Sequence, residues 1–337
     1  LGNTVLTLAD WAKTQDPNGS PARIVELLGQ TNEMLLDMDW REGNLPTGHR
    51  TTVRTGLPSS TWRLLNGGVT PSKSTTAQID EQCGMLEAYS EVDVGLARLN
   101  GNEAQFRLSE AAAFIESMNQ EMQQTTIYGN SGLAPEEFTG LAPRYSSLSA
   151  ASGQNIINGG GAGSDNTSIW LVVWGPNTVH GIYPKGSSAG LQHKDLGQQT
   201  VTVGTGIGGA KMQAFLDHFQ WKCGIALRDW RYAVRIANID VSNLTAESSA
   251  AYLPKLMIRA LHRIPAMGMG RPVFYCNRTV RQMLDIQRLN TMAGITSVSS
   301  TGGGSISYDQ VDGRWTPSFR GVPIRLCDQI TETEAAV

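Results

Sequence analysis

The chain has 337 residues, of which 40% are hydrophobic and 17% charged, and its formal net charge is −3. This length suits about two domains or one large elaborated domain. The chain is slightly acidic and has no run of Lys or Arg longer than two. These features argue against tight nucleic-acid binding through neutralisation of phosphates but do not exclude weak contact.

Neither a membrane span nor a secretory signal is expected. The sequence has no apolar run of about 18 residues, and its start lacks a basic segment followed by an apolar core. The four cysteines form no C-x-x-C pair: Cys83, Cys223, Cys276 and Cys327. We predict buried free thiols in a reducing compartment.

The first 43 residues are predicted to form an arm and a helix. Residues 1–19 end in the turn Asp16-Pro17-Asn18-Gly19, after which Ser20 suits an N-cap and Pro21 the first helical position. The apolar residues that follow keep helical spacing to about Asp39: Ile24, Leu27, Leu28, Leu35 and Met38.

Residues 44–92 predict a long, polar, two-stranded ribbon. Thr51–Thr55 and Ser60–Leu64 contain strand formers, Asn66-Gly67-Gly68 supplies a tight turn, and the chain returns from Val69 to Ile79. Because an isolated hairpin is marginally stable in water, we expect the ribbon to lean on another surface.

A long helix is predicted from Glu103 to Gln124, with Asn102 as its N-cap. At ~1.5 Å rise per residue it would be about 33 Å long. Apolar residues at steps of three and four form one stripe: Ala104, Leu108, Ala111, Ile115, Met118 and Met122. The opposite face is polar: Arg107, Glu110, Glu116, Asn119 and Gln123. We expect the stripe to pack on the chain's own sheet, although a coiled-coil seam would have the same spacing.

The remaining chain predicts mixed strands and helices, and therefore an α+β protein. The unbroken apolar run Ile169–Trp174 predicts a buried strand. Further strands are predicted at Thr200–Val203, Phe219–Asp229, Tyr232–Ile236, Pro272–Cys276 and Gly321–Leu326. Helices are predicted over Glu247–Arg263, where Pro254 suggests a late start or a kink, and after Asn277 as N-cap. A short acidic tail ends the sequence.

A glycine motif offers an alternative function. Gly204, Gly206 and Gly209 match G-x-G-x-x-G, and Asp229 follows 20 residues after Gly209, as in a nucleotide-binding oxidoreductase. However, no regular βαβ series follows, and only Ala210–His218 could form the crossover helix. A hairpin or loop explains the same glycines.

No catalytic residue, cofactor site or metal site is selected by the sequence, and we predict that the protein is not an enzyme. The spacings of His180, His193 and His218 fit no compact metal-ligand motif. The aromatic residues are more informative, because Trp62 lies in the polar ribbon and Trp11 in the arm, and aromatic side chains are enriched in interface cores.

We therefore hypothesise an inter-subunit contact. Its predicted residues lie in the ribbon and the arm: Arg50, Arg54, Trp62, Arg63, Asn66, Gly67, Gly68 and Trp11. The alternative is that each tryptophan packs on its own subunit.

Four short motifs resemble those of tailed-bacteriophage major capsid proteins of the Hong Kong 97-like fold. They are Gly43-Asn44-Leu45-Pro46-Thr47-Gly48-His49, Tyr128-Gly129-Asn130, Val273-Phe274-Tyr275-Cys276-Asn277-Arg278 and Phe319-Arg320-Gly321-Val322-Pro323-Ile324. The resemblance covers nearly the whole chain and is greatest to the Bordetella-phage type of short-tailed phages.

The resemblance implies five regions. They are an N-terminal arm and helix (1–43), an extended β-ribbon loop (44–92), a peripheral domain with the spine helix (93–140), a mainly axial domain (141–290) and a return to the peripheral domain with the C-terminal tail (291–337).

It also implies a major capsid protein that self-assembles into hexamers and pentamers of an icosahedral shell enclosing double-stranded DNA. The expected partners are copies of itself, scaffolding and portal proteins, cement or decoration proteins, and packaged DNA through weak non-specific contact. The expected location is the virion, with assembly in the host cytoplasm. A non-viral encapsulating shell of the same fold is a further alternative.

Overall fold

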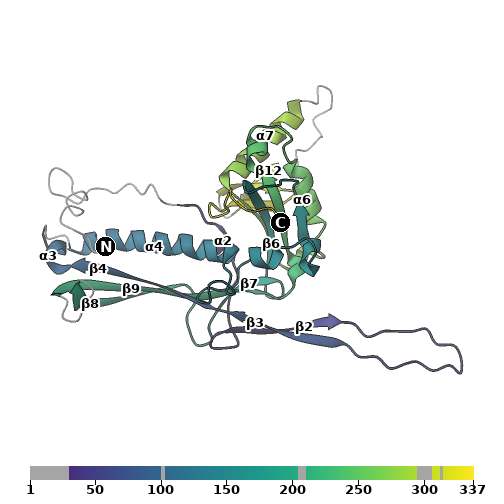
Figure 1. Cartoon of the computed structure of the whole chain (residues 1–337), viewed down its shortest axis with the longest axis horizontal. Coiled ribbons are helices and arrows are strands. Elements are labelled where there is room, and N and C mark those ends of the chain that lie inside the picture. The colour runs from purple at the N-terminus through teal and green to yellow at the C-terminus, as the bar shows by residue number, and fades with distance from the viewer. Residues whose placement is uncertain (1–29, 100–102, 204–209, 294–305, 312–313) are drawn as a thin grey trace. The chain divides into compact units, whose positions relative to one another are not determined.

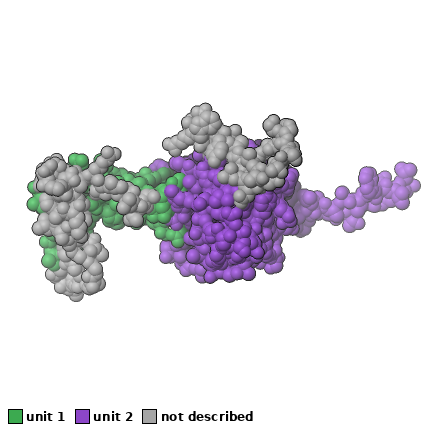
Figure 2. All heavy atoms as spheres, turned by 90° about the horizontal axis from the view of Figure 1, so that it is seen from above, with its two compact units in different colours: residues 1–32, 85–124, 190–222 green, residues 33–84, 125–189, 223–337 purple. Residues whose placement is uncertain are grey.

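The computed structural model describes residues 30–99, 103–203, 210–293, 306–311 and 314–337 (Figure 1). The chain forms two compact units (Figure 2). Unit 1 combines residues 1–32, 85–124 and 190–222, and unit 2 combines residues 33–84, 125–189 and 223–337. Each unit therefore draws on segments that are far apart in the sequence.

Unit 1 is built on a long antiparallel hairpin and a long helix. Its elements, three of which continue into unit 2, are β4 (Gly84–Asp93), α3 (Val94–Ala97), α4 (Glu103–Tyr128), β8 (Leu191–Val203) and β9 (Ala210–Leu227). The β8–β9 ladder runs from the pair Leu191 and Trp221 to the pair Val203 and Ala210, and β4 pairs with β9. The predicted spine helix is thus confirmed and extends four residues further than expected.

The face of α4 that packs within unit 1 differs from the prediction. Phe106 is buried in a cluster with Phe215, and Phe114 stacks on Phe219 with ring centroids 6.3 Å apart. Met118 is buried as predicted, but Leu108 is 71% exposed and Ile115 is 43% exposed. The prediction was wrong for these two residues because it omitted the phenylalanines, whose large rings bury more apolar area than the aliphatic stripe.

Arg107, which lies on the polar face opposite the predicted stripe, joins α4 to the hairpin. Its guanidinium group donates to Asp217 on β9 at 3.0 Å and to Asp195 on β8 at 2.8 Å. It also lies 4.9 Å from the centre of the Phe215 ring. The ion pairs and the ring contact explain why this helix face, although charged, is the packed one.

Unit 2 contains the central sheet, its covering helices and the ribbon. Its strands are β1 (Trp40–Glu42), β2 (Gly48–Gly56), β3 (Thr75–Gln82), β5 (Ile156–Asn158), β6 (Asn166–Trp174), β7 (Val179–Tyr183), β10 (Ala233–Asp240), β11 (Arg271–Cys276), β12 (Ile306–Val311), β13 (Arg314–Phe319) and β14 (Val322–Leu326). Its helices are α2 (Met34–Asp37), α5 (Val241–Thr245), α6 (Leu253–Leu261) and α7 (Arg278–Ala293), with short 3-10 turns η1 (Ala142–Tyr145), η2 (Ala151–Asn155), η3 (Trp230–Tyr232) and η4 (Met267–Met269).

The sheet is centred on β6, in which all nine residues are buried. The strand order β12-β13-β14-β11-β6-β7 continues to β9, while β10 pairs with both β6 and β5, and β1 pairs with β7. Side chains of β6, β10 and β11 share one apolar cluster with α6 and α7, including Leu171, Ile236 and Met257. The predicted buried strand at Ile169–Trp174 is therefore the middle of the core.

Two helix starts in unit 2 follow local sequence signals, an N-cap residue and a proline. Asn277 accepts a hydrogen bond from the Val280 amide at 2.8 Å, which confirms it as the N-cap of α7. The helix expected over Glu247–Arg263 begins only at Leu253, with Pro254 in its first turn. In the predicted first helix, the described part contains α2, and residues 1–29 lie outside the described residues.

Within the described residues, no helix is long and apolar enough to cross a membrane.

Candidate assembly surface

The ribbon is an antiparallel pair that belongs to unit 2 and extends away from the rest of that unit (Figures 1 and 2). Strands β2 and β3 pair from Gly48 and Gln82 to Gly56 and Thr75. Across this ladder Arg50 forms a bidentate ion pair with Asp80, with both distances 2.6 Å. The pair is exposed, so water and salt screen it and it contributes little to the stability of the ribbon.

The paired part is shorter than the sequence predicts. Ser60–Leu64 and Val69–Ser74 lie outside the ladder, although the prediction placed strands there. Pro71 lies in the second stretch and Pro58 lies two residues before the first, and proline lacks the backbone N–H that a ladder requires. The predicted turn is confirmed, because Asn66 has a φ of 65° and the Gly67 amide donates to the Leu64 carbonyl at 3.0 Å.

The tip of the ribbon, residues 57–74, is exposed at every position. Trp62 is fully exposed, and its apolar neighbours Leu57, Leu64 and Leu65 are each more than 80% exposed. Between Thr55 and Ile79 the only charged residues are Arg63 and Lys73. The tip is therefore an apolar and cationic surface that its own subunit does not cover.

The root of the ribbon is buried and polar. Glu81 forms a bidentate ion pair with Arg144, with both distances 2.6 Å. On the other strand, His49 Nε2 lies 3.0 Å from an Arg228 nitrogen, which can only donate, so His49 must accept there as a neutral ring. The His49 ring also packs edge-on against His180, with centroids 5.8 Å apart.

Burial shapes the chemistry of this histidine pair. Burial, with Arg228 nearby, lowers the pKa of His49 and lowers the pKa of His180 to about 4. Both rings are thus neutral at pH 7, and they join β2 to β7 and to the end of β9. The base of the ribbon is buried and polar contacts join it to the rest of unit 2, whereas its tip is exposed. This arrangement is expected of an element that binds another molecule.

The structure brings seven of the eight predicted contact residues onto this ribbon. Arg50 is engaged by Asp80, while Arg54, Trp62 and Arg63 are exposed, with Asn66, Gly67 and Gly68 forming the turn. Trp11 lies outside the described residues. The residues of the root were not predicted, since no local signal links Glu81 to Arg144 or His49 to Arg228.

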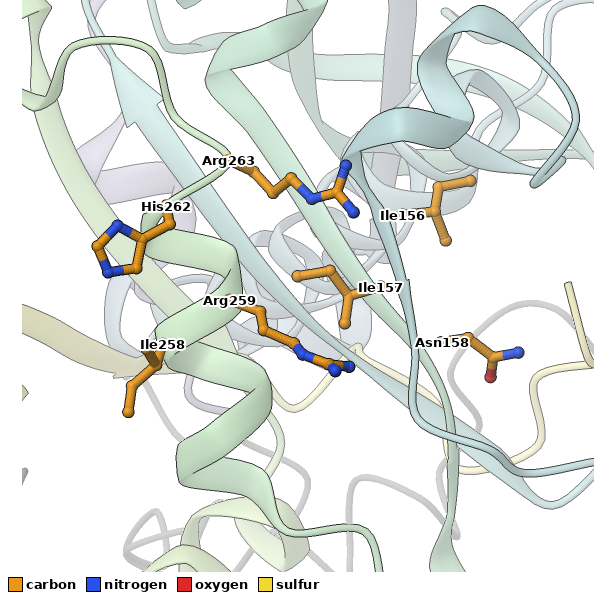
Figure 3. Close-up of a pocket in the computed structure, with 7 residues that line it drawn as sticks. All are labelled: Ile156, Ile157, Asn158, Ile258, Arg259, His262 and Arg263. Carbon is orange, nitrogen blue, oxygen red and sulfur yellow. The ribbon is translucent and has the colours of Figure 1, made fainter.

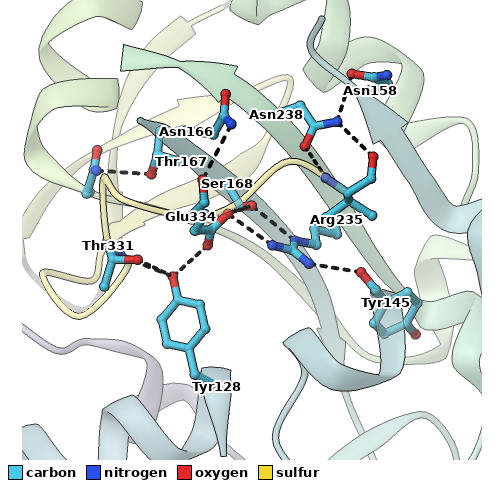
Figure 4. A network of polar contacts seen from close by, with 12 residues as sticks. Tyr128, Tyr145, Asn158, Asn166, Thr167, Ser168, Arg235, Asn238, Thr331 and Glu334 are labelled. Carbon is cyan, nitrogen blue, oxygen red and sulfur yellow. Dashed lines mark hydrogen bonds and ion pairs between the residues drawn. The ribbon is translucent and has the colours of Figure 1, made fainter. Parts of the chain in front are cut away.

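The C-terminal tail supplies a second feature that the sequence did not reveal (Figure 4). Glu334 is buried, and its carboxylate accepts hydrogen bonds from Tyr128 at 2.6 Å, from Ser168, and from Arg235 at 3.0 Å. Arg235 also donates to the Tyr145 carbonyl at 2.9 Å. The acidic tail is therefore an integral part of unit 2, because it neutralises a buried arginine of the central sheet.

The described residues on both sides of the glycine motif are paired strands, and no helix follows it. Gly204, Gly206 and Gly209 fall outside the described residues, but the flanking residues Val203 and Ala210 pair with each other in the β8–β9 ladder. Ala210–His218 forms a strand. A dinucleotide fingerprint requires a helix whose N-terminus faces the pyrophosphate, so this geometry contradicts it.

The histidines and cysteines are the side chains that most often bind metals or act as nucleophiles. No group of three or more possible metal ligands occurs among the described residues. All four cysteines are free, and burial raises the pKa of the Cys83 and Cys276 thiols to about 12. Such thiols are protonated at pH 7 and are poor nucleophiles.

Comparison with known proteins decides the family. Residues 16–337 match the family of the major capsid protein GP7. The chain belongs to this family of phage major capsid proteins. A chain in the cryo-EM structure of bacteriophage Epsilon15 is 34% identical, with a TM-score of 0.77, and the alignment covers 100% of this chain and 98% of that one. No curated protein sequence matches the chain.

Two other solved shells are more distant. The capsid of the native GTA particle is 10% identical (TM-score 0.45, 70% of this chain and 99% of that chain). The holo-SrpI encapsulin complex from Synechococcus elongatus PCC 7942 is 12% identical (TM-score 0.42, 70% and 97%). Likenesses of this size carry no functional argument, whereas the family match and the 34% identical Epsilon15 chain favour a phage capsid over a non-viral encapsulating shell.

Family membership establishes what this capsid protein is. It has the phage capsid fold, it is a structural component of the virion, and it is not an enzyme. Capsid proteins of this kind assemble with copies of themselves into a shell of capsomers. The oxidoreductase alternative is therefore wrong.

Proposed function

We propose that this capsid subunit forms hexamers and pentamers of an icosahedral shell around double-stranded DNA. In that shell the ribbon of each subunit binds a neighbouring subunit. The observation that carries this proposal is the uncovered tip, in which Trp62 and Leu57, Leu64 and Leu65 face solvent. A soluble monomer gains nothing from such a surface, whereas a shell subunit buries it against the next copy.

The chemistry of the tip suits an interface. Tryptophan and arginine carry a large share of binding energy in protein interfaces, and the ribbon offers Trp62 beside Arg63, with Arg54 on the ladder. Full burial of an aromatic side chain removes about 150–250 Å² from water. Arg50 is already engaged by Asp80, so we assign it to the stiffness of the ribbon. Trp11 is proposed to add a contact from the arm.

We retain the five regions 1–43, 44–92, 93–140, 141–290 and 291–337 as a proposed domain division. Within 141–290, residues 190–222 group with α4 in unit 1. We therefore assign that hairpin to the peripheral domain, and the strands of the central sheet that lie within 141–290 to the axial domain.

Further partners are proposed from the role of a capsid subunit. A shell that fills with DNA requires a portal, and correct closure is commonly guided by a scaffold, so scaffolding, portal and cement or decoration proteins are the expected partners. The net charge of −3 favours weak contact with packaged DNA. Assembly is proposed to take place in the host cytoplasm, where buried free thiols persist.

Shortening the ribbon tests the proposal. Joining Pro58 to Ser72 through a small turn removes the exposed tip and keeps the β2–β3 ladder and its root. We expect soluble subunits or capsomers with the urea-unfolding midpoint of the wild type and no closed shells by electron microscopy. A matched control replaces Thr70 alone by serine, a conservative change at an exposed tip position outside the predicted contact residues, and should leave assembly intact.

Normal shells from the shortened protein would reject the ribbon as the assembly element. Loss of folding would mean instead that the tip belongs to the subunit's own stability.

A further inference from the structure

An open groove of about 560 Å³ lies between β5 and α6 of unit 2 (Figure 3). Ile156 and Ile157 contribute buried apolar side chains from β5, and Ile258 lines the groove from α6. Strand β5 pairs only with β10 in the described part of the chain. The groove thus combines an apolar lining with access from solvent.

Two arginines give this groove its charge. Figure 3 shows the guanidinium groups of Arg259, on α6, and Arg263, in the turn after α6, extending toward β5, whereas the His262 ring points to the other side. Both arginines are exposed, and within the described residues neither side chain forms an ion pair or hydrogen bond. Most other arginines of unit 2 are paired with carboxylates, for example Arg144 with Glu81 and Arg235 with Glu334.

The same unit carries a loop with the complementary chemistry, residues 130–137. Leu133 is 85% exposed at its turn. Glu136 and Glu137 follow, and within the described residues neither carboxylate has an ion pair or hydrogen bond. The loop is held in shape because the amides of Leu133 and Ala134 both donate to the Asn130 carbonyl at 2.9 Å. None of its residues lines the groove of its own subunit.

We infer that the loop 130–137 of one capsid subunit seats in the β5–α6 groove of a neighbouring copy. Leu133 enters the apolar lining, and Glu136 and Glu137 pair with Arg259 and Arg263. The inference rests on the proposed function, since it requires copies to assemble, but it uses a surface separate from the ribbon.

The two surfaces contain different residues, so the contact is head-to-tail and leaves one free loop and one free groove on each pair of subunits. A contact of this type adds further copies until a ring closes, which suits a capsomer. Charge complementarity also selects the orientation, because a loop-to-loop or groove-to-groove contact would place like charges together.

Charge reversal on each side tests the contact. We expect Arg259→Glu with Arg263→Glu, or Glu136→Arg with Glu137→Arg, to raise the critical concentration for assembly by about tenfold or more at low salt. Combining all four substitutions should return it to within about threefold of the wild type, because the pairs form again with reversed sign. Sedimentation and electron microscopy give the assembled fraction, and circular dichroism verifies the fold.

The controls carry the same charge changes elsewhere. Lys255→Glu lies on α6 at an exposed position outside the groove lining, and Glu121→Arg lies at an exposed position on α4. Both should leave the critical concentration unchanged. A second measurement does not depend on charge reversal: with Leu133→Cys and Ile258→Cys in one chain, mild oxidation of assembled shells should link copies into a ladder of covalent oligomers.

Shells without such a ladder, or four substitutions without rescue, would overturn the inference and leave the ribbon proposal intact. A defect from the arginine reversal alone, with the glutamate reversal harmless, would overturn it too, since another protein would then occupy the groove. Conversely, a ribbon-shortened protein that still closes shells, but whose copies link through these cysteines, would reject the ribbon and retain this contact.

Discussion

The buried ion pair between Glu334 and Arg235 gives the sharpest stability prediction. The two side chains are only 5% and 6% exposed, and Glu334 accepts hydrogen bonds from Tyr128, Ser168 and Arg235. Glu334→Gln keeps the size of the side chain but removes its charge. The Arg235 guanidinium then stays buried without a counter-charge, and the amide oxygen cannot serve all three donors.

Removal of one partner from a buried pair costs about 3–5 kcal/mol of unfolding free energy. Urea unfolding of unassembled subunits, followed by tryptophan fluorescence, measures the loss. Arg278→Ala is the matched control, because its ion pair with Asp328 has a 63% exposed arginine and should contribute within about 1 kcal/mol.

The double variant separates charge from shape. Arg235→Met combined with Glu334→Gln removes the uncompensated charge, so its cost should be at least about 1 kcal/mol smaller than the sum of the two single costs. If Glu334→Gln proves no more harmful than Arg278→Ala, the tail does not neutralise Arg235 and the reasoning fails.

Three further predictions concern α4, the ribbon tip and the ribbon root. Ile115→Asp should yield folded protein because the side chain faces solvent, whereas Phe106→Ala should cost about 3 kcal/mol in urea unfolding; equal costs would contradict the observed packed face. Trypsin should cleave unassembled subunits at Arg63 and Lys73 before other sites, which mass spectrometry identifies. The same sites should resist cleavage in assembled shells. Equal cleavage in both states would argue against a buried tip. Burial lowers the pKa of His180 to about 4 in the folded protein. Between pH 6.5 and 4 the unfolded chain therefore binds more protons at this residue than the folded chain does. Up to about 3 kcal/mol of the unfolding free energy is lost as the pH falls through that window. His180→Gln should flatten this pH dependence, and an unchanged profile would locate the titration elsewhere.

The sequence by itself determined those elements whose signals are local. The apolar run Ile169–Trp174 has no polar side to expose, so only a strand buried on both faces suits it. Asn277 marked the start of α7 because an N-cap requires only its own side chain and an amide three residues later. The turn at Asn66 was equally clear, since a positive φ is a property of one or two residues. The exposed tip could also be anticipated, because the ribbon is polar over most of its length and two strands alone cannot build a core.

Tertiary structure decided everything that depends on which distant segments meet. The packed face of α4 follows from Phe215 and Phe219 on β9, about a hundred residues away in the chain, and the spacing of aliphatic residues pointed to the wrong face. The pairing of Val203 with Ala210 places the residues that flank the nucleotide-like glycine motif in one antiparallel ladder, where a nucleotide site would need a helix. Arg235 and Glu334 are 99 residues apart, and each by itself looks like an ordinary surface charge. Burial makes such charges interdependent, and burial is a property of the folded chain and not of any short stretch of sequence.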